Sequence, residues 1–279
     1  MKQKISVLAV IYNEEKLIKR CLDSVKDIAD EILILHDGPC SDNSINICKK
    51  YTKKIFINKK NTGLPGPILP ILFRKAKGPW ILNIYADEFL SSGLIKNVKR
   101  LANNSKADAY VFRWPFWDGK KHVTKNWPTR MALYRKSKMS YFGFPHWDDP
   151  QINGNIIRTN FLIEHRPILG CLPTWEQFKN KTLKRYARLQ AEYMLKDAKE
   201  FDTFQYSGEK FPPLHFRIRI KFPLLSAIPF AILAFFKTLF SEGAWKEGYP
   251  ALNEAAQSLI YQLYLGYLVY QLKKKSKKV

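Results

Sequence analysis

The chain has 279 residues, of which 46% are hydrophobic and 14% aromatic. This composition excludes a disordered chain, and the length is sufficient to bury a core without disulfide or metal cross-links. Lysine and arginine number 47 against 24 aspartates and glutamates, which leaves a formal net charge of +23. Such a charge predicts an anionic partner: a nucleic acid, an acidic membrane surface or a phosphate-bearing ligand.

Short apolar runs alternate with amphipathic segments through the first half of the chain. The runs predict buried strands, and the segments, whose apolar residues recur three and four positions apart, predict helices. This alternation is typical of βαβ units and a parallel sheet. Strands are expected at 5–11, 31–35, 54–57, 79–84 and 109–112, and helices at 14–25 and 41–51.

The pattern changes beyond residue 125, where an aromatic loop at 141–150 separates two further predicted strands. Two long apolar stretches and a basic tail then close the chain. We expect an α/β domain at 1–205 and a helical, apolar and basic extension at 206–279. The predicted elements are strands at 131–134 and 156–165, a helix at 181–196, apolar stretches at 222–236 and 255–272, and the tail at 273–278.

The four cysteines, at positions 21, 40, 48 and 171, form no CxxC pair. Their number and spacing predict neither a zinc site nor a disulfide framework, so a reducing compartment is expected. The first apolar run, at 5–11, is too short for a signal peptide and is followed by YNEE. We therefore expect a cytoplasmic protein.

Polar side chains follow three of the predicted strands, at the point where each strand ends. They are residues 12–15 (YNEE), 36–42 (HDGPCSD) and 85–88 (YADE). Ligands of parallel sheets bind outside the carboxyl ends of the strands, so these residues are the candidates for a binding site. None of the three segments carries GxGxxG or GxxxxGK[ST], which excludes a dinucleotide fingerprint and a P-loop.

These motifs, in this order, resemble the family 2 glycosyltransferases, which have the GT-A fold. The resemblance implies a Rossmann-like, mostly parallel sheet flanked by helices, and transfer of a sugar from a nucleotide-diphosphate sugar. It rests on 10–15 (VIYNEE), 37–44 (DGPCSDNS), Asn61-x-Gly63 and 78–91 (GPWILNIYADEFLS). The second half is similar to the subgroup of lipopolysaccharide-core glucosyltransferases, through Pro145-His146, Glu164-His165, Lys184-Arg185-Tyr186-Ala187 and Glu242-Gly243-x-x-Lys246-Glu247-Gly248.

Transfer from a nucleotide diphosphate needs a hard divalent cation, Mg²⁺ or Mn²⁺, which prefers carboxylate oxygens. Asp87 matches the second acid of the family's DxD motif and is the expected ligand, whereas Tyr85 stands in place of the first acid. The resemblance adds Glu88, acting through a water, and His165, which matches a late histidine of the family. Because Mg²⁺ keeps several waters, one firm carboxylate is sufficient.

The resemblance implies that residues at the strand ends hold the nucleotide sugar. An aromatic ring can stack on the base, and the Asp37 carboxylate can accept a hydrogen bond from a ring N–H; a turn role for Asp37 is the alternative. Arg130 is added as a guanidinium partner of the diphosphate. For Asp42 we favour a helix N-cap, and Glu15 fits a first-turn acid. The residues expected to line the site are Tyr12, Asn13, Glu14, Asp37 and Ala86.

An inverting transferase also needs a general base that deprotonates the acceptor hydroxyl. The resemblance places this base in a loop of the second half, where residues 145–150 read PHWDDP. Asp148 and Asp149 are the candidates, with Asp148 preferred. A turn before Pro150, with Trp147 packed locally, is the alternative.

The two apolar stretches near the C-terminus approach transmembrane length, but prolines interrupt the first and glutamines the second. From Lys210 onward there are eleven basic and three acidic residues. We expect two helices that lie in one leaflet of an anionic membrane, so that the enzyme binds the inner face of the cell membrane peripherally and acts on a lipid-linked or membrane-held glycan. A helical cap packed on the core and a true two-helix span are the alternatives.

Three other functions are the alternatives. A sugar-phosphate nucleotidyltransferase would carry a glycine-rich basic loop where this chain has residues 12–15, which argues against it. A nucleic-acid-binding protein would fit the charge, but no RNP1, KH, zinc-finger or basic-zipper pattern occurs, and we expect no nucleic-acid partner. A catalytically inactive membrane scaffold of the same fold stays open because the first DxD acid is missing.

Overall fold

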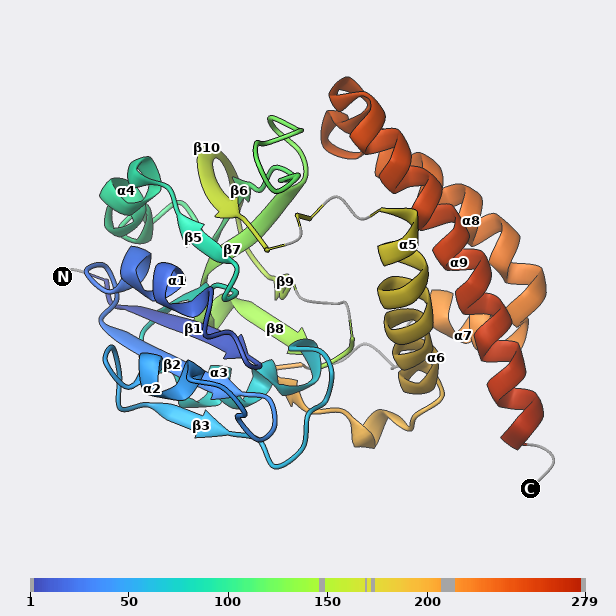
Figure 1. The fold of residues 1–279 in the computed structure, drawn as a ribbon, viewed down its shortest axis with the longest axis horizontal. Coiled ribbons are helices and arrows are strands. Elements are labelled where there is room, and N and C mark those ends of the chain that lie inside the picture. The colour runs from blue at the N-terminus through green and yellow to red at the C-terminus, as the bar shows by residue number, and fades with distance from the viewer. Residues whose placement is uncertain (1–2, 146–148, 169, 172–173, 207–213, 277–279) are drawn as a thin grey trace.

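The computed structural model describes residues 3–145, 149–168, 170–171, 174–206 and 214–276. Within these ranges an eight-stranded sheet forms the core of the N-terminal part of the molecule, and the C-terminal helices lie to one side of it (Figure 1). Strands β7 and β5 run antiparallel to their neighbours, and the other neighbouring strands are parallel. The expected α/β class with a mostly parallel sheet is therefore confirmed. In spatial order the strands are β3 (Ile55–Ile57), β2 (Glu31–His36), β1 (Ile5–Ile11), β4 (Trp80–Asn83), β7 (Thr129–Arg135), β6 (Ala109–Arg113), β10 (Ile156–His165) and β5 (Glu88–Leu90).

Strand β1 organises the sheet because both of its faces are buried. Its odd-numbered residues pack under one layer of helices and its even-numbered apolar residues under another, as the two-residue period of a strand requires. Helices α1 (Ile18–Val25), α2 (Ser44–Cys48) and α4 (Ser92–Ala102) cover the first face. Helix α3 (Leu69–Lys75), preceded by η1 (Gly66–Ile68), covers the second.

A smaller sheet of three antiparallel strands extends the second face. These strands are short, and their sequences lack the long apolar runs from which strands were predicted, so they were not expected. The spatial order is β11 (Thr203–Phe204), β8 (Met139–Phe142) and β9 (Gln151–Ile152), and η2 (Lys136–Lys138) joins β7 to β8.

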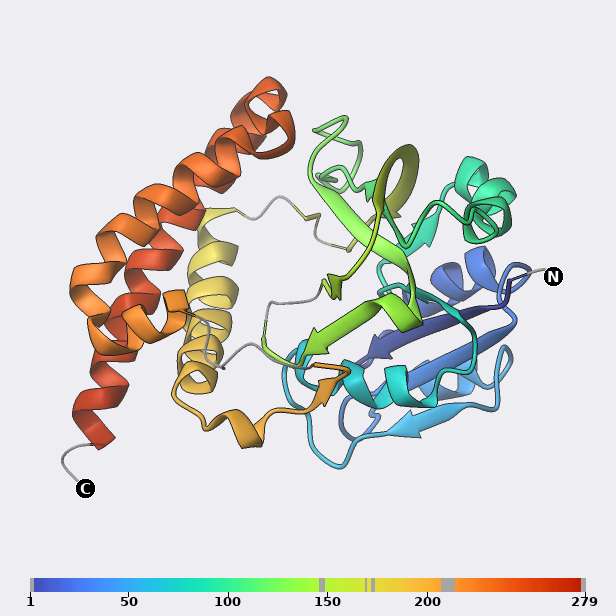
Figure 2. The ribbon, with the colours of Figure 1, turned by 180° about the vertical axis from the view of Figure 1, so that it is seen from behind.

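One continuous helical rod separates the sheet from the C-terminal helices (Figures 1 and 2). The rod contains α5 (Trp175–Gln177), the π-helix η3 (Phe178–Ala187) and α6 (Arg188–Met194), where the sequence predicts a helix at 181–196. The remaining helical segments are η4 (Ala198–Glu200), α7 (Leu214–Lys221), α8 (Pro223–Phe240), η5 (Ser241–Glu247) and α9 (Tyr249–Ser276).

Helices α8 and α9 form a tight hairpin over the two predicted apolar stretches. Gly266 permits their close approach, since a Cβ there would lie 2.6 Å from the Cβ of Ala227. Helix α9 lies against η3 and α6, where the Tyr261 hydroxyl donates to Gln190 Oε1 at 2.6 Å. Among the described residues one helix, α8, is long and apolar enough to cross a membrane, and 17% of that window is buried.

A single carboxylate, that of Glu31, joins the strands at the edge of the sheet away from their carboxyl ends. It accepts hydrogen bonds from the Ser6 hydroxyl, the Lys54 ammonium and the backbone N–H groups of Lys77 and Gly78. Burial raises the pKa of Glu31, but these hydrogen bonds outweigh burial and lower the pKa from 4.5 to about 2. The carboxylate therefore stabilises the folded state only while it is ionised.

We expect Glu31→Gln to lower the free energy of unfolding by about 1–3 kcal/mol at pH 7. Because the folded-state pKa is depressed, this contribution is fully present above the unfolded value of 4.5 and is lost as the pH falls toward about 2. Urea unfolding at several pH values measures it. Glu192→Gln, at a half-exposed surface position next to Arg188, serves as the control and should change stability by less than about 0.5 kcal/mol. A difference between Glu31→Gln and the parent that is independent of pH would contradict this account.

Candidate active site

Two adjoining cavities open at the carboxyl ends of β1, β2 and β4. The larger has a volume of about 970 Å³ and reaches the helical rod, and the smaller, of about 430 Å³, lies over the strand ends. Ligands of parallel sheets bind at this edge, so the cavities are where the sequence predicts the site. Five residues line both cavities: Glu14, Asp87, His165, Arg185 and Tyr186.

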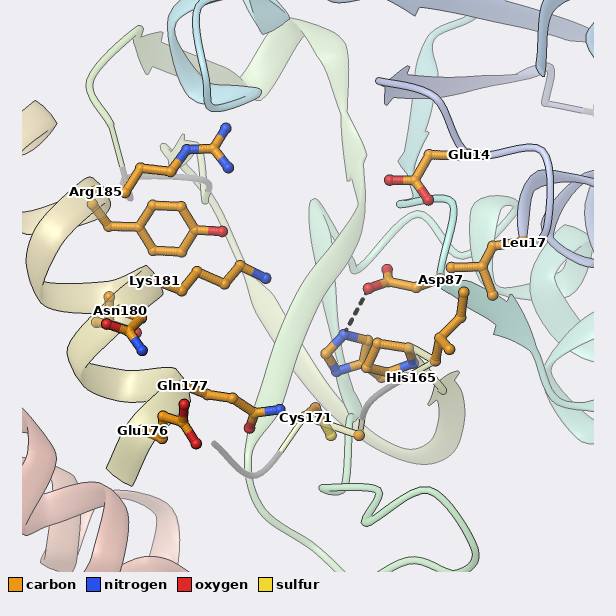
Figure 3. A pocket seen from close by; sticks show the side chains of 15 residues that line it. Glu14, Leu17, Asp87, His165, Cys171, Glu176, Gln177, Asn180, Lys181 and Arg185 are labelled. Carbon is orange, nitrogen blue, oxygen red and sulfur yellow. Dashed lines mark hydrogen bonds and ion pairs between the residues drawn. The ribbon is translucent and has the colours of Figure 1, made fainter. Parts of the chain in front are cut away.

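Asp87 and His165 form a pair at the junction of the cavities (Figure 3). His165 Nε2 lies 3.2 Å from Asp87 Oδ2, although the two residues are 78 positions apart in the chain. Burial lowers the pKa of His165, but the bond to Asp87 and the neighbouring Cys171 thiol outweigh it and raise the pKa to about 9. Burial raises the pKa of Asp87, and His165 outweighs that effect and lowers it.

The ring of His165 is held in place by Trp114. The two rings are stacked, with centroids 4.0 Å apart and an interplanar angle of 8°. Trp114 Nε1 in turn donates to Glu88 Oε1 at 2.6 Å. The orientation of His165, and through it that of Asp87, therefore depends on a buried carboxylate that does not itself face the cavities.

Glu88 is fully buried, and both of its oxygens have protein partners. Besides Trp114 it accepts hydrogen bonds from the Tyr85 backbone N–H, at 2.8 Å, and from the Arg130 guanidinium. Glu88 begins strand β5, whose side chains alternate between faces, so it points inward where its neighbour Asp87 points to the cavity. We therefore no longer assign Glu88 to the metal ligands.

Arg130 is also turned inward, and it is 7% exposed. Burial lowers its pKa, but the charge of Glu88 beside it outweighs burial and raises the pKa above its usual value. Tyr85 stands where the DxD motif would have its first acid. The centroid of its ring lies 4.1 Å from Arg130 Cζ. Arg130 therefore neutralises Glu88, and we withdraw its assignment to the diphosphate.

Glu14 belongs to the Asp87 end of the site. Its pKa is raised to about 7, first by burial and then by the charges of Asp87 and Asp42. Its side chain points into the cavity above Asp87 (Figure 3). Burial and the two neighbouring carboxylates thus both disfavour the charged form of Glu14, and a cation bound beside Asp87 would favour it.

The residues present fit a divalent cation. Asp87 and His165 provide an oxygen and an imidazole nitrogen from two separate elements, and the carboxylate of Glu14 lies close by. Oxygen and imidazole ligands suit Mn²⁺, and oxygen ligands suit Mg²⁺. The ion would be held by Asp87 and His165, with Glu14 close enough to balance its charge.

A second group of potential ligands, His36, Cys40 and Asp42, lies behind the strand ends. The two nitrogens of His36 already face the Gly38 carbonyl, at 2.7 Å, and the Asn13 N–H, at 3.2 Å. Asp42 accepts from the Ser44 N–H at 2.9 Å. These contacts hold the loop after β2 in shape, so we assign the group a structural role. The expected cap by Asp42 is wrong by one position: Asn43 is the N-cap residue of α2, and Asp42 accepts from the N–H of Ser44, the first residue of that helix.

The smaller cavity receives most of the residues expected to line a nucleotide site. Tyr12, 45% exposed, and Ala86 lie on its wall. Asp37 lies there too, but it is 4% exposed and accepts bonds from the Thr62 N–H and hydroxyl and the Gly63 N–H. Asp37 therefore positions the loop at 58–63, and its expected hydrogen bond to a nucleobase would be an additional role.

Asn13 lines neither cavity. Asn13 donates to the Ser41 hydroxyl at 2.8 Å and accepts from the Ser41 N–H at 3.0 Å, so it ties the end of β1 to the next loop. Of the two candidate bases, Asp148 lies outside the described residues. Asp149 is exposed, and its charge acts on buried Arg130 and Tyr134.

Two parts of the site are not predicted by the sequence. Trp114 lies just after β6, and nothing in its surroundings distinguishes it from a core tryptophan. The other part is the face of the rod formed by Gln177, Lys181 and Arg185. Their four-residue spacing in the sequence predicts one polar face of a helix, but only the fold shows that this face lines a cavity.

A model of one protein family, described as "Glycosyl transferase family 2", matches residues 6–166. The chain belongs to this family. The matched segment contains the strand ends, Asp87 and His165, so the family named by the sequence resemblance and its α/β GT-A fold class are confirmed. The narrower similarity to lipopolysaccharide-core glucosyltransferases stays a prediction.

Relatives match parts of this chain. An uncharacterized glycosyltransferase of Rickettsia typhi is 30% identical over 39% of this chain and 36% of its own length. A poly(ribitol-phosphate) beta-glucosyltransferase of Bacillus spizizenii is 29% identical over 38% of this chain and 18% of its own length. The matches thus span about a third or less of these relatives. Among solved structures, S. aureus TarS 1–349 in complex with UDP-GlcNAc has a TM-score of 0.47 and 15% identity, covering 98% of this chain and 92% of that chain.

We expect Arg130→Met to lower the free energy of unfolding by about 3–5 kcal/mol, because it leaves the Glu88 carboxylate buried without a cation. The double variant Glu88→Gln/Arg130→Met should recover part of the loss, since it removes the charge as well. Chemical unfolding measures both. Arg100→Met, on the exposed side of α4, is the control and should stay within about 0.5 kcal/mol of the parent. If Arg130→Met is as stable as Arg100→Met, the folded state does not depend on the pairing of Glu88 with Arg130.

Proposed function

We propose that this chain is an inverting glycosyltransferase that moves a sugar from a nucleotide-diphosphate sugar to a hydroxyl of an acceptor glycan or lipid. The observation that carries the proposal is the Asp87–His165 pair, which lies at the carboxyl ends of the parallel strands between two cavities of about 970 and 430 Å³. The family match over residues 6–166 supports it.

In this proposal the nucleoside occupies the smaller cavity, against Tyr12 and Ala86, and the diphosphate lies at Asp87. A bound Mg²⁺ or Mn²⁺ would neutralise charge on the leaving diphosphate. Asp87 and His165 hold the ion, and Trp114 fixes the imidazole ring so that its Nε2 stays on the Asp87 side. Glu14 carries a proton for part of the time near pH 7, which limits the negative charge of the site before the ion binds.

The base that takes the acceptor proton stays assigned to the loop at 145–150. Asp149 is the described candidate, and it is an exposed residue. Asp148 is the other candidate in this proposal.

The acceptor is proposed to be held at an anionic membrane on the cytoplasmic side. The support is the outer face of α8, whose large apolar side chains are turned outward: Leu225 is 78% and Leu233 62% exposed. Lys221 and Trp245 stand near its two ends, as suits the boundary between acyl chains and anionic headgroups. The proposed division is thus a nucleotide-sugar domain at 1–205 and a membrane-interface extension at 206–279, with α9 packed as a cap and α8 facing the leaflet.

We expect Asp87→Asn to reduce donor turnover about 100-fold or more without unfolding the protein, because the ion loses its carboxylate and with it several kcal/mol of charge stabilisation. Release of nucleoside diphosphate from UDP-, GDP-, dTDP- and ADP-sugars, with and without Mn²⁺, measures turnover, and thermal unfolding checks the fold. Asp27→Asn, an exposed change of the same kind, should leave turnover unaltered. Full turnover by the Asp87 variant would reject the metal role.

Leu225→Asp/Leu233→Asp should lower binding to vesicles that contain 30% phosphatidylserine at least about 10-fold, because two leucines no longer enter the leaflet. Co-sedimentation with these vesicles and with neutral vesicles, at two salt concentrations, measures binding. Ile57→Asp, at an exposed apolar position of β3 in the sheet domain, is the matched control. A parent protein that fails to sediment with anionic vesicles would contradict the membrane assignment while leaving the transferase proposal intact.

A further inference from the structure

Two basic side chains of the rod face the acidic end of the site across the larger cavity. Lys181 and Arg185 extend from η3 toward Asp87 and Glu14, which come from the sheet (Figure 3). The cavity thus has one wall with carboxylates and a histidine and an opposite wall with two cations, beyond which Glu176 lies at the start of the rod. A ligand that fills it meets both.

Among the described residues, no carboxylate forms an ion pair with Lys181 or Arg185, whereas Arg188, one turn further, pairs with Glu192 at 3.1 Å. Lys181 acts on Glu14 only at longer range, where its charge partly offsets the rise in the pKa of that carboxyl. Arg185 Nη2 donates to the Gly63 carbonyl at 3.2 Å, and the Lys181 ammonium lies 5.7 Å from the ring centroid of Tyr186. A guanidinium has five N–H donors, so one backbone bond orients Arg185 and leaves donors for a ligand.

The rod is fixed in position by its other side. Phe178 and Ala187, at the two ends of η3, are buried, and η3 packs against α9. Residues four apart lie on one side of a helix, so Gln177, Lys181 and Arg185 share the side that faces the cavity. Arg185 also touches the loop that Asp37 holds, which links the cationic wall to the smaller cavity.

We propose that Lys181 and Arg185 bind the diphosphate of the donor from the side opposite Asp87 and His165. This inference rests on the proposed function and adds the residues that take the leaving group. Ammonium and guanidinium groups are the side chains that bind phosphate oxygens most strongly, and a guanidinium can bind two oxygens at once. A nucleoside diphosphate is the ligand class whose charge matches a wall of two cations facing a metal-binding pair.

The two cations also have a place in the reaction. When the bond between the sugar C1 and the β-phosphate oxygen breaks, that oxygen takes the electron pair and the diphosphate gains negative charge. The acceptor oxygen forms the new bond to C1, and its proton goes to the base. Lys181 and Arg185 stabilise the charge that develops on the leaving diphosphate, in a position set before the reaction begins. They supply positive charge at a site where Tyr85 has replaced one metal-binding acid.

The test separates phosphate binding from nucleoside binding. Calorimetry with Mn²⁺ gives the affinities of UDP, GDP, dTDP and ADP, and ligand-observed NMR gives those of the matching nucleosides. We expect Lys181→Met/Arg185→Met to weaken the diphosphate that the parent binds best at least about 100-fold, because two charge-assisted contacts are lost, and to leave its nucleoside within about 2-fold. Arg185→Lys alone should lose less than Arg185→Met.

Lys179→Met/Lys184→Met is the matched control, since it removes the same charge from the same helix at exposed positions that line neither cavity. Its diphosphate affinity should stay within about 2-fold of the parent, and thermal unfolding should show all variants folded. If the parent binds none of the diphosphates, the proposed function fails. Two other results would overturn only the assignment of Lys181 and Arg185 to the diphosphate. In the first, Lys181→Met/Arg185→Met binds the diphosphate as tightly as the parent does. In the second, the control loses as much diphosphate affinity as Lys181→Met/Arg185→Met.

Discussion

The candidate site depends on one buried ion pair, Glu88 with Arg130. A carboxylate without solvent contact is costly unless a cation and hydrogen bonds satisfy it, and here Arg130, the Tyr85 N–H and Trp114 do so. The contacts connect the turn after β4, the ends of β6 and β7, and, through the stacked rings, β10. Because Trp114 can neither shift nor rotate without breaking its bond to Glu88, His165 stays beside Asp87. The positions of Asp87 and His165 thus depend on Glu88 and Arg130, two charged side chains that do not line the cavities.

The cavity above this pair has walls of opposite character. The sheet contributes Asp87, Glu14 and His165, and the helical rod contributes Lys181 and Arg185, with Glu176 at its start. The rod in turn depends on α9, which packs against it, and α9 carries α8 with its outward apolar face. The helical hairpin therefore supports one wall of the candidate site and also carries the surface proposed to meet a membrane.

Much of the sheet and half of the site were predictable from local pattern. Apolar runs located β1, β2, β4 and β6 to within a few residues, and strand ends identified Asp87 and Tyr12 as cavity residues. The short strands β5, β8, β9 and β11 were missed because two to four residues carry no usable period. Glu88 was assigned to the metal because it adjoins Asp87, and only its direction in β5 shows that it points the other way. Arg130 was assigned to the diphosphate on the assumption that it is exposed, whereas the structure buries it against Glu88.

The sequence by itself determined the α/β class, the family and the edge of the sheet where the site lies, because two-residue periods, buried β-branched runs and strand-end motifs act over a few residues. Only the tertiary structure decided which polar groups face the cavity and which are buried as partners. It also inserted β7 between β4 and β6 and placed Lys181 and Arg185 opposite Asp87. These outcomes depend on contacts between residues tens of positions apart, and each is set by packing and by the cost of burying unpaired charge, which no local pattern records.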